Sequence, residues 1–402
     1  MSSSSEVARG AVCGDLCSQG RMKTLLIEEK RKMGGQCATT SELENYPGII
    51  EDTGPGLMER FRSHAEKFGV EFERGRVAGI EVGDDGFHKE IRLADERTLR
   101  TKSIIIATGA APRILGIPGE KEFRGQGVSY CATCDADFYE ELDVVVVGSG
   151  NTAVEESVFL TKVVNKVTMI VVHDEGKLDA DRVAQEQAFA NDKIEFVWNS
   201  TVDAIEGDGL VNGVRLRNIK TGETQQLATD GVFMFVGTVP QTGFAKDLIE
   251  LNGAGYIKTD DKQQTNIPGI FAVGDVTDKF LRQVVTAAGD GAVAAVAANG
   301  YVEQEEYWQQ QVLKSQTPVL AVFWSPLEGD SVQLIQSLEE MTIAYPDHRI
   351  VTVDTYKNQM LADRYEVQEI PAVLRFEQGQ EQLRLVQPGA VELNQLFQGS
   401  KS

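Results

Sequence analysis

The stretch "SYCATCDADFYEELDVVVVGSGNTAVEES", residues 129–157, contains two neighbouring motifs that decide the fold. Its second half is an apolar β-branched run over 143–147, followed by Gly-x-Gly-x-x-Ala and by a helical pattern over 154–162. In this arrangement the first glycine makes a tight turn, the second lets a pyrophosphate approach the backbone, and the small third residue packs the helix on the sheet. We predict a dinucleotide site formed by Gly148, Gly150, Asn151, Thr152 and Ala153.

The first half of the same stretch carries a Cys-x-x-Cys pair, Cys131 and Cys134, followed directly by Asp135. Oxidation of such a pair closes a small ring, and the thiols can exchange with the disulfide of a partner, one attacking and the other resolving. The adjacent carboxylate can move the proton that thiolate formation releases. The alternative is half of a zinc site, which needs a second ligand pair that the sequence does not show. We therefore predict a redox-active pair and no metal site.

The charge and the cysteine count exclude several classes of protein. Lys and Arg number 39 against 61 Asp and Glu, and the net charge of -22 would repel nucleic acid and anionic lipid surfaces. The longest apolar runs fall short of the ~20 residues that span a bilayer, and the first six residues lack the basic start of a secretion signal. We expect a soluble, cytoplasmic protein. The five cysteines argue against a disulfide scaffold, so Cys13, Cys17 and Cys37 are expected to be free or buried thiols.

The pattern along the chain indicates its architecture. Between residues 24 and 302, short β-branched runs alternate with longer helical stretches, which is typical of an α/β fold with mainly parallel sheets. Strands as apolar as these are covered on both faces. The expected elements are strands over 24–27, 103–107, 143–147 and 167–172, and a hairpin arm that includes 214–217 and 221–223.

The composition changes after residue 301. The stretch "VEQEEYWQQQVLKSQTP" is a polar helical pattern that ends at a proline, and we interpret it as a linker or bridging helix. Beyond it, residues 318–398 begin a new strand–helix–strand series with the length of one small domain.

The stretch over 129–157 resembles the centre of a low-molecular-weight thioredoxin reductase, a two-domain FAD and pyridine-nucleotide enzyme with its redox cysteines in the nucleotide domain. Further stretches are similar to the same family, follow its order, and together cover nearly all of residues 23–302. They are "GGQCATTSELENYPGI" at 34–49, "IIIATGAAPR" at 104–113, "NIPGIFAVGDVTD" at 266–278 and "RQVVTAAGDGAVAA" at 282–295.

The resemblance implies an α/β chain with two Rossmann-like nucleotide-binding domains, one for FAD and one for NAD(P), followed by a thioredoxin-like domain. The expected boundaries are 1–126 and 243–302 for the two parts of the FAD domain, 127–242 for the NAD(P) domain with the cysteine pair, 303–317 for the linker helix and 318–402 for the thioredoxin-like domain.

The same resemblance implies the residues around the flavin. Glu28 would hold the adenosine ribose, since it ends a strand where a dinucleotide fold places such an acid. Asp275 would meet the ribityl chain, although a structural aspartate that caps the next helix is an alternative. Other residues expected to bind the cofactors are Gly34, Gly35, Gln36, Thr39, Asn45, Thr108, Gly109, Arg282, Gln283 and Val284.

One element of the family is missing near the start of the sequence. There the family has a strand and Gly-x-Gly-x-x-Gly that cradle the FAD pyrophosphate, whereas Gly10, Gly14 and Gly20 follow no apolar strand and do not have that spacing. Two explanations compete: the chain has lost the element and binds flavin weakly, or its first ~22 residues are a damaged or wrongly framed translation. We favour the second, because the match resumes abruptly at Met22 and the other flavin motifs are intact.

The region expected to bind the nucleotide 2′ position also departs from the family. Family members that use NADPH carry His-Arg-Arg and a later Arg beyond the second strand of the nucleotide domain. This chain has His173, Asp174 and Glu175 there, and Asp179 at the later position. The acids would repel a phosphate, and a histidine is mostly neutral at pH 7. We predict NADH rather than NADPH, or another electron donor altogether.

The tail, residues 318–402, resembles a thioredoxin, with Ile370-Pro371 where that family has a cis proline. The family's Cys-Gly-Pro-Cys falls on the segment 328–331, which reads Glu-Gly-Asp-Ser, and its buried acid falls on Val322. A domain without a thiol cannot shuttle electrons, so we expect it to serve in docking or in building a dimer.

Together these features predict a thioredoxin reductase-like flavoenzyme. Electrons would pass from NADH through FAD to the Cys131–Cys134 disulfide and then to a thioredoxin or thioredoxin-like protein. The resemblance implies a homodimer, with Cys134 facing the flavin, Cys131 attacking the substrate disulfide and Asp135 donating a proton. Two alternatives stay open: a reductase on the same scaffold that is reduced by ferredoxin, and a non-catalytic relic that acts as a binding or scaffold protein.

Overall fold

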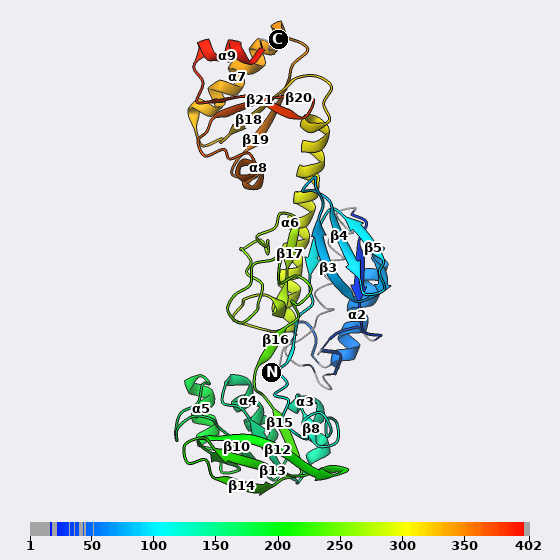
Figure 1. Ribbon diagram of the computed structural model, residues 1–402, viewed down its shortest axis with the longest axis vertical. Helices are drawn as coiled ribbons and strands as arrows, with labels where there is room; N and C mark the ends of the chain where they lie inside the picture. Colours follow the sequence, from blue (N-terminus) through cyan, green and yellow to red (C-terminus); the bar gives the residue numbers. More distant parts are fainter. Residues whose placement is uncertain are drawn as a thin grey trace. The chain divides into compact units, whose positions relative to one another are not determined.

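A computed structural model describes residues 17, 22–31, 33–35, 37–39, 43, 46–50 and 52–397, with the backbone alone for Thr39, Thr133, Cys134, Thr342 and Ala390. The chain divides into two units, residues 1–298 and 299–402. Figure 1 colours both along the sequence. The predicted site residues Gln36 and Asn45, and the glycines of the first 20 residues, lie outside the described residues.

A five-stranded parallel sheet forms the centre of the nucleotide domain in the first unit (Figure 1). Its strand order, β11-β10-β9-β15-β8, places β9 in the middle. This confirms the strands predicted over 143–147 and 167–172. The strands are β8 (Val128–Ser129), β9 (Asp143–Val147), β10 (Lys166–Ile170), β11 (Ile194–Val197) and β15 (Gly231–Met234).

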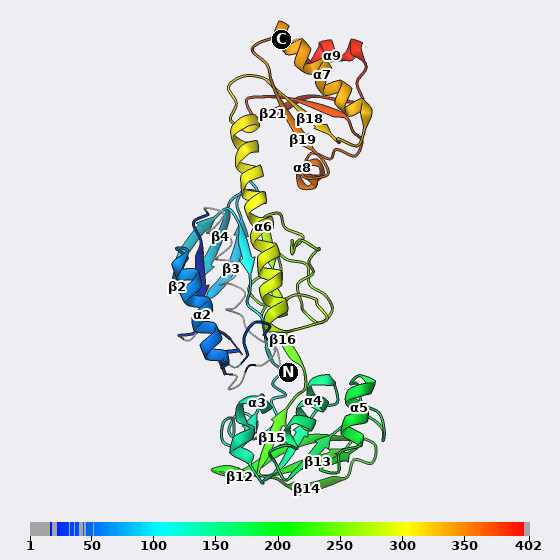
Figure 2. The ribbon, with the colours of Figure 1, turned by 180° about the vertical axis from the view of Figure 1, so that it is seen from behind.

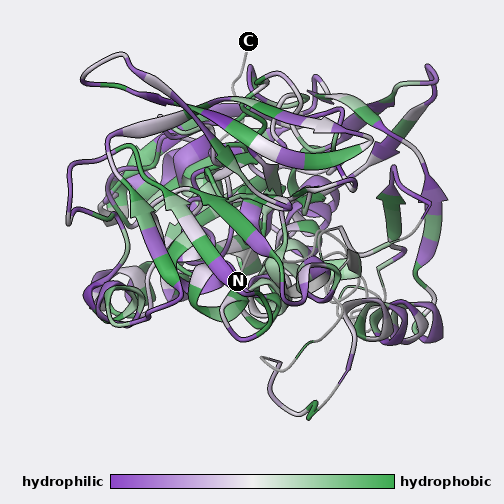
Figure 3. Ribbon diagram, turned by 90° about the horizontal axis from the view of Figure 1, so that it is seen from below, coloured by the Kyte–Doolittle hydropathy of each residue, from purple (hydrophilic) through white to green (hydrophobic). Residues whose placement is uncertain are grey.

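Both faces of this sheet are covered, as the continuous apolar strands predicted. Successive side chains of a strand point to opposite faces. Val144 and Val146 of β9 pack with the helices, whereas Val145 and Val147 pack with an antiparallel meander. Figure 3, coloured by hydropathy, shows apolar (green) stretches on strands and helices of the chain. The helices are α3 (Ala132–Asp135), α4 (Asn151–Leu160) and α5 (Arg182–Phe189), and the meander is β12 (Ser200–Asp208), β13 (Leu210–Asn218) and β14 (Thr224–Ala228), which contains the predicted hairpin.

The rest of the first unit contains two parallel strand pairs, β1 with β2 and β6 with β17, and a separate antiparallel meander, β3-β4-β5. An antiparallel pair, β7 with β16, lies where the chain passes to and from the nucleotide domain. The bounds are β1 (Leu25–Glu28), β2 (Glu71–Arg74), β3 (Val77–Val82), β4 (Lys89–Leu93), β5 (Thr98–Thr101), β6 (Ile104–Ile106), β7 (Ala110–Pro112), β16 (Thr238–Pro240), β17 (Ile270–Ala272), with helices α2 (Gly54–Lys67) and α6 (Val284–Trp308) and 3-10 turns η1 (Cys37–Thr39), η2 (Ala136–Tyr139) and η3 (Gly274–Val276).

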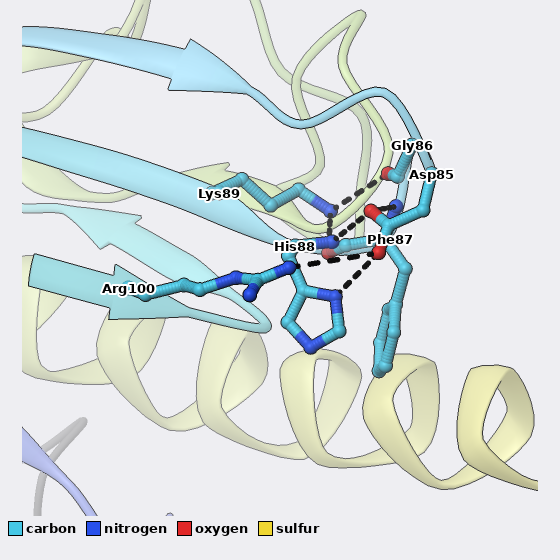
Figure 4. Close-up of polar contacts among 6 residues, drawn as sticks. All are labelled: Asp85, Gly86, Phe87, His88, Lys89 and Arg100. Carbon is cyan, nitrogen blue, oxygen red and sulfur yellow. Dashed lines mark hydrogen bonds and ion pairs between the residues drawn. The ribbon is translucent and has the colours of Figure 1, made fainter.

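The turn between β3 and β4 is held by its own side chains (Figure 4). The buried ammonium of Lys89 donates hydrogen bonds to the carbonyls of Gly86 and Phe87, at 3.3 and 2.9 Å. The Asp85 carboxylate pairs with the His88 ring at 2.6 Å and lies 4.0 Å from Arg100. Burial alone would raise the pKa of Asp85, but the hydrogen bonds from His88 outweigh it and lower this pKa to about 2. The turn therefore fixes the register of the meander with charged groups.

The second unit contains a four-stranded sheet of order β19-β18-β20-β21 (Figure 2). An apolar cluster packs on each face of this sheet. Strands β18 and β19 are parallel and the other neighbours antiparallel, and Ile370-Pro371 is a cis peptide, as the thioredoxin resemblance predicted. The elements are β18 (Val319–Trp324), β19 (Arg349–Asp354), β20 (Ala372–Glu377), β21 (Gln380–Val386), α7 (Gly329–Ala344), α8 (Gln359–Arg364) and α9 (Ala390–Phe397).

The segment 303–317, expected as a linker or bridging helix, is helical up to residue 313 but has no helix start of its own. Its first residues continue α6 to Trp308, and a π-helical turn, η4 (Gln309–Leu313), follows. Trp308 is 1% exposed and packs against Phe323 and Phe376 in one of the two apolar clusters of the second unit. Its indole nitrogen donates to the Tyr365 hydroxyl at 3.0 Å. The polar helix thus contributes a core residue to the thioredoxin-like unit.

Replacing Trp308 should therefore destabilise this unit. We expect Trp308→Ala to lower its free energy of unfolding by about 3–5 kcal/mol, because a large buried side chain leaves a cavity. Tyr307→Ala is the matched control, since its neighbouring side chain is 53% exposed, and it should cost about 0.5 kcal/mol or less. Urea unfolding followed by circular dichroism measures both variants. Equal effects of the two would contradict the packing described for Trp308.

Candidate active site

The cysteine motif begins directly after β8. Cys131 is the N-cap residue of α3, and its sulfur is in a disulfide bond. The Ser129 hydroxyl donates to the Asp135 carboxylate at 2.6 Å and accepts the backbone N–H of Cys131 at 3.1 Å. Cys134 lies in α3, but its side chain is outside the described part of the structure. Ser129 therefore links the carboxylate of Asp135 to the backbone of Cys131.

A buried carboxylate supports the residue that precedes Cys131. Glu120 is 0% exposed and accepts the Tyr130 hydroxyl at 2.8 Å. It also accepts the backbone N–H groups of Leu115 and Gly116, at 3.1 and 2.6 Å. Burial, and next the hydrogen bond to Glu120, raise the pKa of Tyr130, so the phenol stays protonated as a donor. This network fixes the backbone on which the cysteine motif begins.

The glycine loop between β9 and α4 has the geometry that the motif predicted. Gly148 has φ +139°, and a Cβ there would lie 2.3 Å from the carbonyl oxygen of Phe235 and 3.0 Å from Cβ of Ala153. A Cβ on Gly150, in contrast, would meet nothing within 4 Å. The first turn of α4, which contains Thr152, carries no acidic residue. The helix N-terminus therefore offers its amides to an anion beside an open approach to the backbone.

Hydrogen bonds tie the glycine loop to the segment after β10. The Ser149 hydroxyl donates to Asp179 at 2.7 Å. The Asn151 side chain donates to the Asp181 carboxylate at 2.9 Å and accepts the backbone N–H of Asp181 at 2.7 Å. Asp179 also pairs with the His173 ring at 2.6 Å. The structure therefore joins the predicted pyrophosphate loop to two of the residues expected at the nucleotide 2′ position, His173 and Asp179, whereas Asp174 pairs with Lys220 instead.

Two acids of this segment are ionised at neutral pH. The hydrogen bond from Ser149, and next that from His173, lower the pKa of Asp179. The Lys220 ammonium, which forms an ion pair with Asp174, lowers the pKa of that carboxyl. The carboxylates of Asp174 and Asp179 therefore keep their negative charge in the segment that follows β10.

The carboxyl ends of β6 and β17 form a second candidate site. These strands are parallel neighbours, and the backbone N–H of Val273 donates to the Ile106 carbonyl at 2.9 Å. Asp275, in the 3-10 turn that follows β17, is 1% exposed. The Thr108 hydroxyl donates to the Gln241 carbonyl at 2.7 Å, and the carbonyl of Gly109 accepts the N–H of Gln241. Ligands of α/β sheets bind at such an edge.

The structure also brings the segment near Gly34 together with the start of α6. Gly34 has φ +121°, and a Cβ there would lie 2.5 Å from the Met58 side chain. Cys37, Met58 and Val284 belong to one apolar cluster. Gly34 and Val284 come from motifs about 250 residues apart in the sequence, so their clustering supports a shared site.

Three further predicted residues lie at the ends of elements. Glu28 is half-buried at the carboxyl end of β1, and burial raises its pKa. Gln283 directly precedes α6, and the guanidinium of Arg282 stacks 4.3 Å from the centre of the Tyr256 ring. The buried Nε of Arg282 has no hydrogen-bond partner among the described residues. The remaining predicted residues, Gly35 and the backbone of Thr39, lie at or near η1.

Comparison with known proteins assigns the first unit. Residues 10–291 match the family model described as pyridine nucleotide-disulphide oxidoreductase. This chain belongs to that family. It is 47% identical over 293 residues to a thioredoxin reductase of Peptoclostridium acidaminophilum, which covers 71% of this chain and 91% of that protein. A thioredoxin reductase of Bacillus subtilis is 44% identical over 288 residues, with 71% and 89% covered.

Solved structures agree with this assignment. The crystal structure of Lactococcus lactis thioredoxin reductase matches with a TM-score of 0.65 and 44% identity, covering 75% of this oxidoreductase and 97% of that chain. The structure of T. acidophilum thioredoxin reductase matches with a TM-score of 0.62 and 32% identity, covering 74% and 96%. Residues 300–401 match the thioredoxin family model. The α/β fold with a C-terminal thioredoxin-like domain is therefore confirmed.

The two described thiols outside the motif are buried, as expected. Burial raises the pKa of Cys17 to about 11 and, together with the charge of Asp52, the pKa of Cys37 to about 12. Such thiols are poor nucleophiles at neutral pH. No group of His, Cys, Asp or Glu within the described ranges could hold a metal ion. None of the helices in the part of the chain that the structure describes is long and apolar enough to cross a membrane.

The sequence analysis missed Ser129 and Glu120 of this oxidoreductase. A serine two positions before a cysteine and a glutamate after a Pro-Gly pair carry no signal of their own. Their roles depend on hydrogen bonds that bridge residues 6 and 10 positions apart.

Substitutions at the two glycines of the loop separate nucleotide binding from folding. We expect Gly150→Ala to weaken NADH binding by about tenfold or more, because the methyl group occupies the open approach to the backbone, and to change the free energy of unfolding by about 1 kcal/mol or less. Gly148→Ala should instead cost about 2–4 kcal/mol of stability through its positive φ and the contact with Phe235. Fluorescence titration with NADH and urea unfolding measure these effects. Wild-type NADH affinity in Gly150→Ala would show that the loop does not bind the pyrophosphate.

Proposed function

We propose that this chain is an FAD-dependent thioredoxin reductase-like disulfide oxidoreductase that uses NADH. Two electrons and a proton from NADH, with a second proton from water, would reduce a disulfide of a thioredoxin-like protein to two thiols. The observation that carries this proposal is the group formed by Cys131, Ser129 and Asp135, in which a disulfide-bonded cysteine and a carboxylate share one serine hydroxyl. The names of the relatives, which are thioredoxin reductases, support the substrate class.

The residues of the cysteine motif account for the exchange with the partner disulfide. We propose that Cys134 is the partner of the Cys131 disulfide. After reduction, the thiolate of Cys131 would attack one sulfur of the substrate disulfide, which forms a mixed disulfide and releases the other sulfur as a thiolate. Cys134 would then attack Cys131, so that the motif is oxidised again and the substrate leaves with two thiols. Asp135 would carry the proton exchanged with the thiols, in the orientation that Ser129 fixes.

The residues at the second site suit FAD. When bound, FAD would supply the redox chemistry that links NADH to the disulfide. The buried carboxylate of Asp275 would accept a hydroxyl of the ribityl chain, and the Nε of Arg282, buried without a partner among the described residues, would donate to the flavin ring. Gly34 would let the backbone approach the flavin where a Cβ has no room. Glu28 would accept the ribose hydroxyls.

The charges after β10 favour NADH over NADPH. Asp174, Glu175 and Asp179 contribute three carboxylates to this segment, and the pKa values of Asp174 and Asp179 are lowered. Lys220 is engaged with Asp174, and His173 is engaged with Asp179. A carboxylate at the end of the second strand suits the 2′-hydroxyl of NADH, whereas it would repel the 2′-phosphate of NADPH.

The thioredoxin-like unit would take no part in electron transfer. No cysteine follows Cys134 in the sequence, and the segment 328–331, which includes the first three residues of α7, carries acids and a serine instead. Val322, at the position of the family's buried acid, is fully buried among apolar side chains. We propose that this unit serves in docking or in forming a homodimer.

Reduction of the bound flavin tests the electron path. Under anaerobic conditions, we expect NADH to bleach the flavin of the wild-type protein loaded with FAD, and thioredoxin reduction to follow. Cys131→Ser should lower the rate of thioredoxin reduction by about 10³-fold or more, while flavin reduction by NADH stays within about threefold, because the exchange step alone needs this thiol. Cys17→Ser, which changes a buried thiol outside both the motif and the cluster around Met58, is the control. Bleaching by reduced ferredoxin but by neither nicotinamide would support the ferredoxin alternative, and a protein that takes up no FAD would support the non-catalytic one.

Charge reversal after β10 tests the choice of nicotinamide. We expect the double variant Asp174→Arg/Glu175→Arg to raise kcat/KM for NADPH by about tenfold and to leave that for NADH within about threefold, since exposed charge pairs contribute on the order of 1 kcal/mol each. Asp208→Arg, which reverses an exposed acid at the turn between β12 and β13, should change neither value. An unchanged ratio in the double variant would mean that these acids do not select the cofactor.

A further inference from the structure

One ion pair of the first unit is largely buried. The ammonium of Lys279 lies 2.5 Å from Oδ2 of Asp290, and the two side chains are 15% and 17% exposed. The pair between Lys258 and Glu250 has a similar length, 2.6 Å, but its side chains are 52% and 57% exposed. Exposed pairs contribute little, whereas removing one partner of a buried pair leaves an uncompensated charge. The pair formed by Lys279 and Asp290 therefore constrains the residues around it.

The same oxygen of Asp290 holds the turn that follows β17. Oδ2 of Asp290 accepts the backbone N–H of Gly274 at 2.9 Å. The carbonyl of Gly274 accepts the hydroxyl and the N–H of Thr277, at 2.6 and 2.9 Å. Gly274 has φ +71°, a conformation that glycine adopts readily. The backbone of Gly274 is therefore fixed at both ends, its N–H by Asp290 of α6 and its carbonyl by Thr277 of the turn.

Two residues expected at the flavin lie next to these contacts. Asp275 directly follows Gly274 and is almost fully buried. Arg282 lies between Lys279 and the start of α6, and its buried Nε has no hydrogen-bond partner among the described residues. Lys279 and Asp290 thus join the ends of a 12-residue segment, 279–290, that contains Arg282 and the first residues of α6. Loss of this pair would remove one constraint on Arg282 directly and one on Asp275 through Gly274.

We propose that Asp290 and Lys279 are positioning residues for the flavin: Asp290 orients the Gly274–Asp275 turn, and Lys279 neutralises the carboxylate that does so. The inference rests on the proposed function, because it takes FAD as the ligand. Asp290 acts through Gly274 rather than by contact with the cofactor. If the contacts of Asp290 with Gly274 and Lys279 were purely structural, they would instead stabilise the protein equally with and without FAD.

The affinity of the apoprotein for FAD, measured by quenching of flavin fluorescence, tests the proposal. We expect Asp290→Ala to raise the dissociation constant by about tenfold or more, because it removes a charge-assisted hydrogen bond to the turn. Asp290→Asn should have a smaller effect, since an amide oxygen can still accept the N–H of Gly274, and Lys279→Met should also weaken binding. Glu250→Ala, in the exposed pair, is the matched control and should stay within about twofold.

Unfolding of the same variants without FAD completes the test. A rise in the dissociation constant of Asp290→Asn or Lys279→Met, with an unfolding midpoint of the apoprotein like that of the wild type, would support the positioning role, even if Asp290→Ala does not fold. Unchanged FAD affinity in both conservative variants would overturn it and leave the proposed function intact. A wild-type protein that takes up no FAD would overturn the proposed function as well.

Discussion

The parallel register of the central sheet determines where the chemistry of this oxidoreductase lies. Ser129 of β8 pairs with Phe233 of β15, Phe233 pairs with Val146 of β9, and Val146 pairs with Met169 of β10. Since all these strands run in the same direction, the residues that follow them reach a single edge of the sheet. Cys131, Gly148 and His173 therefore lie along one edge, and the cysteine motif is two strand spacings, about 10 Å, from the glycine loop.

This register depends on the burial of β9 on both faces. A shift by one residue would exchange Val144 and Val146, which pack against the helices, with Val145 and Val147, which pack against the meander. Both clusters would have to repack, so the register is strongly specified. Each face of the sheet has room for the valine side chains of β9. The loop after β9 does not, since only glycine fits at position 148 beside the Phe235 carbonyl. Packing in the core of the sheet thus places the loop that the nucleotide needs.

The sequence was sufficient for the elements whose signal is local. The β9–glycine loop–α4 unit was predictable because a strand buried on both faces is a continuous apolar run, and because the turn demands glycine. The core position of Trp308 was not, since the residues around it are Glu, Gln and Tyr and their pattern is that of a solvated helix. The buried positions of Glu120 and Lys89 were also unpredictable, because the groups that compensate their charges are backbone amides and carbonyls. A sequence gives no indication of which backbone groups will converge on one side chain.

In both candidate sites, hydrogen bonds across a turn orient a carboxylate or are made by one. Asp135 is fixed by the Ser129 hydroxyl, Asp179 by Ser149 and His173, and Asp290 fixes Gly274. An acid that acts on a proton must keep access to solvent or substrate, and Asp135 is correspondingly half-buried. An acid that only orients a backbone gains from burial, provided that a cation compensates its charge, and Asp290 is paired with Lys279 in this way. Asp135 and Asp290 are both half-buried, and their partners differ: an uncharged serine hydroxyl holds Asp135, whereas the Lys279 ammonium neutralises Asp290. The first arrangement suits proton transfer and the second suits positioning.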